Sequence, residues 1–314
     1  MIDLHQDIQL HRKRPETYPE GFRNQTSFSQ LEAADISVVF GSGFAAPVSG
    51  DFFDPEAVDL LTEDLGLYRK HVAEANRWEM VTSGSDLQAV VDAENKHGII
   101  FHIEALNTFT GNEQEWNRLE AWHENGWRSV GIVWNKTNKL GGGTHDRETG
   151  LTDLGYEVLS WAQHRNMVVD LAHMNPPTFS AALEATSGPV ILSHGNARHV
   201  TDTDRNYSDE QLVEVAKRGG VVGVFFSASN VASSDPDVSD VVEHIEHMQS
   251  LIGIDHIALG TDFGGLTGEP VSGLESVTNL VNLRKALRNA GFNRTEIEKI
   301  WQDNARRVLE DVLP

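Results

Sequence analysis

Apolar runs in this sequence end repeatedly in a histidine or an acidic residue. One such ending means little, because a histidine at a strand end is usually an ordinary hydrogen-bonded residue. Imidazole and carboxylate groups are also the ligands that proteins without cysteine offer to Zn²⁺, and this chain has no Cys. The recurrence therefore predicts a metal site. The candidates at run ends are His5, Asp7, Glu104, His173, His194 and Asp262.

The spacing of these residues suggests two ions. His5 and Asp7 are two residues apart, so in a strand both point to one face and can bind the same ion. His173 and His194 end neighbouring predicted strands and can share a second ion. Glu104 is a carboxylate that can bridge the two cations.

Such a pair of ions would perform hydrolysis. Two cations about 3.5 Å apart polarise a carbonyl and lower the pKa of a shared water toward 7, which supplies a metal-bound hydroxide. Asp262 can take the proton of that water, so Asp262 and Glu104 are the predicted catalytic residues. The nitrogen and oxygen donors suit two Zn²⁺ per chain, with Mn²⁺, Co²⁺ or Fe²⁺ as alternatives.

Eight runs rich in β-branched residues can be marked, and the candidate residues lie at the ends of five of them. Their near-continuous apolar character is typical of parallel strands covered on both faces. Strand and helix patterns alternate, which predicts an α/β fold of the (β/α)8 TIM barrel type, with active-site residues at the carboxyl ends of the strands. A doubly wound sheet is the alternative, but no G-x-G-x-x-G follows the first run. The runs are 2–5, 35–40, 98–104, 128–134, 167–172, 189–193, 220–226 and 256–261.

Helical patterns fill the connections. The long connection 41–97 is expected to hold a helical insertion between strands two and three, with helices at 55–77 and at 86–96 after Ser85. Another helix is expected at 153–165 after Thr152. Capping boxes are predicted for Ser208 with Gln211 and for Thr295 with Glu298.

Composition limits the partners. The net charge of −22 disfavours nucleic acid, and no apolar run is long enough for a membrane span. The 314 residues are predicted to form one barrel domain, 1–314. Met1 leads directly into the first strand without a signal peptide, which predicts a cytoplasmic protein. The many acidic residues and few lysines also fit a protein from a salt-adapted source.

The sequence gives less reason to place the other histidines among the metal ligands. His102 lies two residues before Glu104 and is expected in a layer beneath the site. His244 and His247 are three apart on a predicted helix, a spacing that can bind metal, but packing and capping are the preferred reading. His145 can reach the site from its loop. His199 has no distinguishing arrangement.

The sequence resembles the membrane dipeptidases, also called renal dipeptidases, within the amidohydrolase superfamily. The matching motifs run through nearly the whole chain, from the His-x-Asp of the first strand to the closing helix. They are His5-Gln-Asp7, the segment 98–104, the segments 150–155 and 169–173, the segments 193–198 and 205–210, and the segments 252–263 and 304–308.

The resemblance implies a zinc dipeptidase. Glu104 would bridge a dinuclear site, with His5 and Asp7 on one ion and His173 and His194 on the other. Arg205 would bind the carboxylate of a dipeptide substrate, a role that suits guanidinium geometry. D-residues would be accepted at the C-terminal side of the substrate, and a homodimer is expected.

The sequence departs from the family in three places. Trp134 and Asn135 follow the fourth strand, where well-studied members carry a histidine that contacts the scissile carbonyl, so both are candidate substrate-binding residues. Ser227 stands where an aromatic hydroxyl is common, and Gly264 where an acid is usual.

These departures keep other functions open. One alternative is a metal-dependent hydrolase of another small amide or a lactone on the same site. Another is a metal-stabilised binding protein without activity. A sugar-phosphate or nicotinamide enzyme has Gly264 and Gly265 as its only hint.

Overall fold

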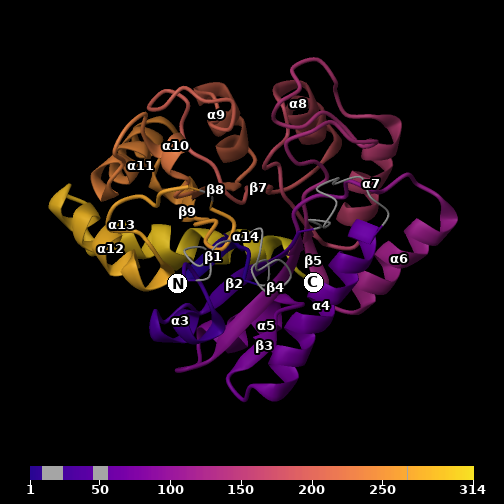
Figure 1. The fold of residues 1–314 in the computed structure, drawn as a ribbon, viewed down its shortest axis with the longest axis horizontal. Helices are drawn as coiled ribbons and strands as arrows, with labels where there is room; N and C mark the ends of the chain where they lie inside the picture. Colours follow the sequence, from indigo (N-terminus) through magenta and orange to yellow (C-terminus); the bar gives the residue numbers. More distant parts are fainter. Residues whose placement is uncertain (9–23, 45–55, 267) are drawn as a thin grey trace. The chain divides into compact units, whose positions relative to one another are not determined.

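The structure, a computed structural model, describes residues 1–8, 24–44, 56–266 and 268–314. The chain divides into two compact units. The first consists of Met1–Val39 with Ile191–Val308, and the second of Phe40–Val190 with Leu309–Pro314. Strands and helices alternate along both, as Figure 1 shows. The prediction of one domain stays a prediction.

The first unit is built on four parallel strands that pair in the order β1-β9-β8-β7. Every residue in them is buried, which explains their continuous apolar sequences. The strands are β1 (Ile2–Gln6), β7 (Ile191–Leu192), β8 (Val221–Val224) and β9 (Ile257–Leu259). The helices are α3 (Phe28–Ala33), α9 (Asp209–Lys217), α10 (Ala228–Val231), α11 (Val238–Ile252), α12 (Leu280–Asn289) and α13 (Arg294–Glu298), with short helices η1 (Ile254–His256), η2 (Val277–Asn279) and η3 (Lys299–Asp303).

In the second unit the strands pair in the order β6-β5-β4-β2, and β3 also pairs with β4. The strand β2 (Val38–Gly43) begins in the first unit. The other strands are β3 (Trp78–Met80), β4 (His97–Ile103), β5 (Trp127–Val130) and β6 (Val168–Val169). The helices are α4 (Glu56–Glu74), α5 (Gly84–Val91), α6 (Glu113–Glu124), α7 (Asp153–Gln163) and α8 (Pro176–Ala185), and α14 (Asn304–Val312) ends in this unit.

Each of the eight predicted runs overlaps a strand, but several bounds were wrong. The second strand starts later than predicted because Asp35 adopts a left-handed φ of 54° and forms a turn. The strand β3 was missed because it is three residues long and lies in the connection predicted as a helical insertion. Among the described residues, no helix has the length and apolar character to cross a membrane.

The capping predictions had mixed outcomes. Thr152 caps α7, and Ser208 with Gln211 forms the predicted box at α9. The predicted cap Ser85 was wrong, since Ser83 accepts the Asp86 N–H and starts α5 two residues earlier. The predicted box at Thr295 was also wrong, because Asn293 and Glu296 form it.

Buried Asn304 ties the closing helix to the start of β9. Its Nδ2 group donates to the carbonyl oxygens of Ile254 at 2.7 Å and Ile257 at 2.8 Å. These bonds join the last helix to the first residue of η1 and to the first residue of β9. The side chain thus fixes the strand that leads to Asp262.

Replacing Asn304 should therefore destabilise the fold. Asn304→Ala leaves two acceptors without this donor, and we expect a loss of about 2–3 kcal/mol in the free energy of unfolding. Urea unfolding measures it. Asn289→Ala, at an exposed position of α12, is the control. Equal stability of the two variants would contradict the role given to Asn304.

Candidate functional site

Backbone pairing that continues past β1 and β9 places His5, Asp7 and Asp262 close together. Asp3 is in register with Leu259. The pairing continues past the strands, where Asp262 N donates to His5 O at 3.0 Å and Asp7 N donates to Phe263 O at 2.9 Å. The residues that follow each strand are therefore held side by side.

The side chains meet around His5. Its Nε2 lies 3.7 Å from Asp7 Oδ2 and 3.7 Å from Asp262 Oδ1. The His194 ring, which follows β7, has its centroid 4.1 Å from that of His5. Ligand atoms of His5, His194 and Asp262 all lie within 4.8 Å of one another. We call His5, Asp7, His194 and Asp262 the first ligand group.

Asp3 forms hydrogen bonds that hold the backbone next to the first ligand group. Its Oδ2 accepts from Gln6 Nε2 at 2.6 Å and from Thr261 Oγ1 at 2.7 Å, and its Oδ1 accepts from Thr261 N at 3.0 Å. Burial raises the pKa of Asp3, while these donors lower it. Sequence reasoning missed Asp3, although Asp3, His5 and Asp7 are spaced two apart and so share one face of the strand.

Asp262 is under electrostatic and conformational stress. Burial raises its pKa to about 7; His5 and Arg205 oppose this rise, and Asp7 adds to it. The φ of Asp262 is 62°, in the left-handed region that non-glycine residues rarely adopt. Such a residue costs about 1–3 kcal/mol and is typical of functional sites. A cation here would relieve the repulsion between Asp262 and Asp7.

The two glycines after Asp262 fit closely against the acids. A Cβ on Gly265 would lie 2.2 Å from Asp7 Oδ2 and 2.8 Å from Asp262 Oδ1. Gly264 has φ +93°, and a Cβ there would lie 2.5 Å from Asp7 O. This geometry gives a physical reason for glycine at both positions.

Arg205 is anchored beside His194. Its Nη2 donates to His194 O at 2.9 Å and its Nη1 donates to Tyr207 Oη at 3.0 Å. The guanidinium carbon lies 5.1 Å from the centre of the Phe225 ring. These contacts place a positive group close enough to lower the pKa of Asp262.

The second unit holds a second ligand group, formed by Glu104 and His173. Glu104 follows β4 and His173 follows β6, and His173 Nε2 lies 3.0 Å from Glu104 Oε1. Asn135 Oδ1 lies 3.0 Å from His173 Nδ1, so the Nδ1–H donates to it. The lone pair of Nε2 is then directed toward Glu104, as in metal-binding histidines.

A buried pair lies at the base of this second group. His102 Nε2 is 3.5 Å from Asp170 Oδ2, and His102 Nδ1 is 3.0 Å from Ser129 Oγ. Asp170 Oδ1 accepts the Ala172 N–H at 2.9 Å, which shapes the turn where His173 takes a left-handed φ of 64°. His102 is thus a buried residue, as predicted, and Asp170 is a positioning residue that sequence reasoning did not select.

The two residues after the fourth predicted strand have different surroundings. The Trp134 ring packs between Phe44, at 5.1 Å, and His173, at 6.0 Å. Asn135 contacts His173, so its observed role is to orient a ligand. Its predicted substrate contact stays a prediction. His145 is exposed on its loop.

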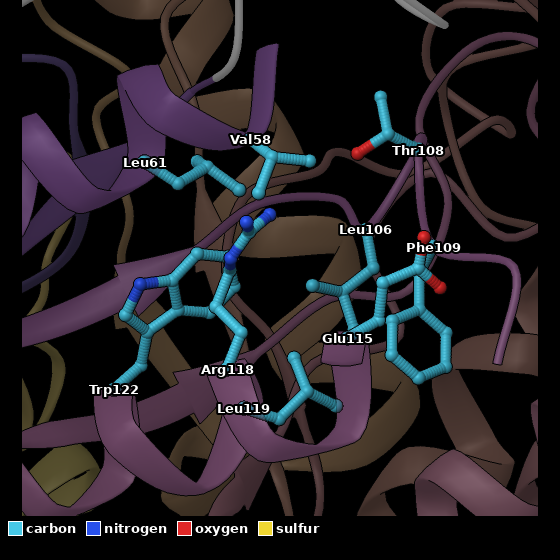
Figure 2. Close-up of a pocket in the computed structure, with 9 residues that line it drawn as sticks. All are labelled: Val58, Leu61, Leu106, Thr108, Phe109, Glu115, Arg118, Leu119 and Trp122. Atoms are coloured by element: carbon cyan, nitrogen blue, oxygen red, sulfur yellow. The ribbon is translucent and has the colours of Figure 1, made fainter. Parts of the chain in front are cut away.

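A separate apolar cavity lies in the second unit between α4, α6 and the loop after β4 (Figure 2). Trp122 and Leu119 form one wall, and Val58 and Leu61 form another. None of the candidate ligands lines it. We therefore place the chemistry at the two ligand groups and not in this cavity.

The structure thus brings His5, Asp7, His194 and Asp262 together, and separately brings Glu104 to His173. The predicted sharing of one ion by His173 and His194 joins residues of different units and stays a prediction. So does the bridging role of Glu104.

Known proteins resemble this chain along its length. The family model of the membrane dipeptidases, peptidase family M19, matches residues 1–313. A Klebsiella pneumoniae protein, named as an uncharacterized protein in the pqqA 5′ region, is 30% identical over 270 residues, covering 82% of this chain and 97% of that protein. Dipeptidase 3 of Homo sapiens is 27% identical, covering 99% of this chain but 65% of its own length. The chain therefore spans about two thirds of that relative.

Solved structures share the fold. A metallo peptidase from Rhodobacter sphaeroides, liganded with a phosphinate mimic of L-Ala-D-Ala, matches with a TM-score of 0.86 at 21% identity and covers 99% of this chain and 98% of its own. The dipeptidase AC, an M19 metallo peptidase, matches with a TM-score of 0.87 at 23% identity, with coverages of 99% and 98%. The (β/α)8 fold class predicted from the sequence is confirmed.

The raised pKa of Asp262 predicts a pH-dependent stability. The Asp262 carboxyl ionises near pH 4 in the unfolded chain and near pH 7 in the folded chain. The free energy of unfolding therefore falls as the pH rises from about 4 to about 7. In chelator-treated protein, Asp262→Asn should therefore raise the free energy of unfolding by about 1–3 kcal/mol at pH 8 and by little at pH 4. Denaturant unfolding at both pH values tests this.

The matched control is Asp202→Asn, because Asp202 is an exposed aspartate of the same unit. It should change stability little at either pH. A destabilised Asp262→Asn protein at pH 8 would show that the carboxylate is favourably paired in the folded chain, against this account.

Proposed function

Because the chain belongs to the membrane dipeptidase family of metallopeptidases, we propose that it is a zinc-dependent dipeptidase. Membership confirms the enzyme class predicted from the sequence, a hydrolase of peptide bonds. The observation that carries the proposal is the first ligand group, where two imidazoles and two carboxylates converge beside Arg205.

The nitrogen and oxygen atoms of the candidate ligands are suited to binding a metal ion. His173 presents Nε2 while Asn135 binds its other nitrogen, which is the arrangement of a metal-binding imidazole. Asp7 Oδ1 is buried without a hydrogen bond among the described residues. We propose that His5 and Asp7 hold one ion, that His173 and His194 hold another, and that Glu104 bridges them, as the family resemblance implies. Zn²⁺ is the first choice, with Mn²⁺, Co²⁺ or Fe²⁺ as alternatives.

The metal and the side chains of the protein would then have separate roles in peptide hydrolysis. Bound metal supplies Lewis acidity toward the peptide carbonyl and acidifies the attacking water. The Asp262 carboxylate takes the proton that the water loses and delivers it to the departing amine. Burial keeps Asp262 in a range where it can both accept and release that proton.

Arg205 would select the substrate. A guanidinium forms paired hydrogen bonds with a carboxylate, so Arg205 can bind the free C-terminus of a dipeptide. The Rhodobacter sphaeroides relative is liganded with a mimic of L-Ala-D-Ala. We therefore include dipeptides with a C-terminal D-residue among the substrates.

A second candidate function keeps the same residues but changes the substrate to another small amide or a lactone. Trp134 favours it, because an indole next to His173 replaces the histidine that well-studied family members carry there. Ser227 stands at the N-cap position of α10, without a side-chain cap bond, where an aromatic hydroxyl is common in the family that the sequence resembles. We also propose a cytoplasmic location and a homodimer, both from the sequence and the resemblance.

Metal removal and a Glu104 variant test the main proposal. Purified protein should contain two ions per chain by elemental analysis and lose dipeptide turnover with a chelator. Glu104→Gln should lower kcat by about a thousandfold or more, since it removes a charged ligand. His164→Ala, at an exposed histidine, is the control. Metal-loaded protein inactive on L,L and L,D dipeptides would refute the proposal.

Arg205 distinguishes the two substrate classes. Arg205→Ala should lower kcat/KM about a hundredfold for dipeptides and change it little for dipeptide amides, which lack the carboxylate. Steady-state kinetics on matched pairs provides the measurement. Equal losses on both substrates would contradict a carboxylate-binding role and favour the second candidate function.

A further inference from the structure

A second cluster of metal-binding side chains lies in the first unit, outside the first ligand group. It consists of His199 in the turn after β7, Asp209 at the start of α9, and His247 in the middle of α11. One ligand atom from each residue lies within 4.8 Å of the other two. We call these residues the peripheral cluster.

The contacts within the cluster are close. His247 Nε2 lies 2.8 Å from Asp209 Oδ1. The rings of His199 and His247 stack with centroids 4.4 Å apart and planes inclined by 8°. Their side chains reach the surface: His199 is exposed, and His247 and Asp209 are 17% and 35% exposed. A solvent ion can therefore reach all three.

The backbone that carries the cluster is firmly held. Buried His244, one turn before His247, accepts the Ala197 N–H at 3.2 Å and donates from Nε2 to Val231 O at 3.0 Å. Asp209 follows the capping residue Ser208. Side-chain movement, chiefly of the exposed His199, is therefore enough to complete a metal site.

The required movement is small. A tetrahedral ion with bonds of about 2.1 Å holds its ligand atoms roughly 3.4 Å apart. His247 Nε2 and Asp209 Oδ1 are 2.8 Å apart, so they must separate by roughly 0.6 Å to admit the ion, and His199 must rotate out of its stacked position. The ion would take the place of the proton between His247 and Asp209.

The electrostatic surroundings favour a cation. Glu243 and Glu246 are exposed on α11 next to His247, and Glu210 is exposed next to Asp209. The guanidinium of neighbouring Arg198 is directed to the carbonyl oxygens of the loop, including Asn206 O at 2.7 Å. Two imidazoles select borderline metals such as Zn²⁺, Ni²⁺ or Cu²⁺ over Mg²⁺ or Ca²⁺.

We propose that His199, Asp209 and His247 form a peripheral binding site for a divalent transition ion of the Zn²⁺ class. The ion would join the turn after β7, α9 and α11. It would thereby brace the segment between His199 and Asp209, which carries Arg205. This inference does not depend on the dipeptidase proposal, because it concerns bound ions and not turnover.

Zinc binding tests the proposal. Metal-loaded full-length protein is freed of loose ions by gel filtration, and Zn²⁺ is then titrated against a chromophoric zinc indicator. Wild-type protein should bind one more ion per chain than His199→Ala or His247→Ala, or bind it at least tenfold more tightly. Added Zn²⁺ should also raise the melting temperature of the wild type more than that of either variant.

The matched control is His164→Ala, which removes an exposed histidine of the second unit and should behave as wild type. His199→Gln, a polar replacement at an exposed position, serves as the second variant should His247→Ala fold poorly. Identical zinc stoichiometry and affinity in wild type and His199 variants would overturn the proposal and leave a simple ion pair of His247 with Asp209.

Discussion

The register between β1 and β9 is the constraint on which the first ligand group depends. Two backbone hydrogen bonds beyond the strand ends, from Asp262 N to His5 O and from Asp7 N to Phe263 O, fix residues far apart in sequence side by side. A shift of one residue would turn His5 and Asp7 to the other face of the strand. Asp3, on the same face of β1 as His5, is bound to Gln6 and Thr261 and opposes such a shift.

Two of the candidate ligands have strained backbones that neighbouring buried groups hold in place. Asp262 and His173 both adopt left-handed backbone conformations that L-residues rarely occupy. Neighbouring buried groups hold each one: Asp3 acts through Thr261 beside Asp262, and Asp170 acts through Ala172 beside His173. Four other described residues with a left-handed φ, Asp35, Asn95, Asn166 and Asp235, are exposed in turns. Asp262 and His173 differ from them because buried groups hold their backbone.

Much of this arrangement could be predicted from the sequence, because strand endings are a local signal. The apolar runs before His5, Glu104, His173 and His194 indicate where strands stop, and parallel strands present such residues at one edge. The contacts of Asn135, Asp170 and Gly264 could not be predicted, since they depend on turns whose φ angles no periodicity reveals. The caps at Ser83 and Asn293 were missed because neighbouring hydroxyls gave the same spacing signal.

The central claim is that the two ligand groups bind metal as one dinuclear centre. The most direct measurement is an anomalous difference map at the zinc absorption edge from crystals of the zinc-loaded protein. The account predicts two strong peaks with ligands drawn from both groups, His5 and Asp7 at one and His173 at the other, with Glu104 touching both. Peaks that avoid either group, or a single ion held without Glu104, would contradict it.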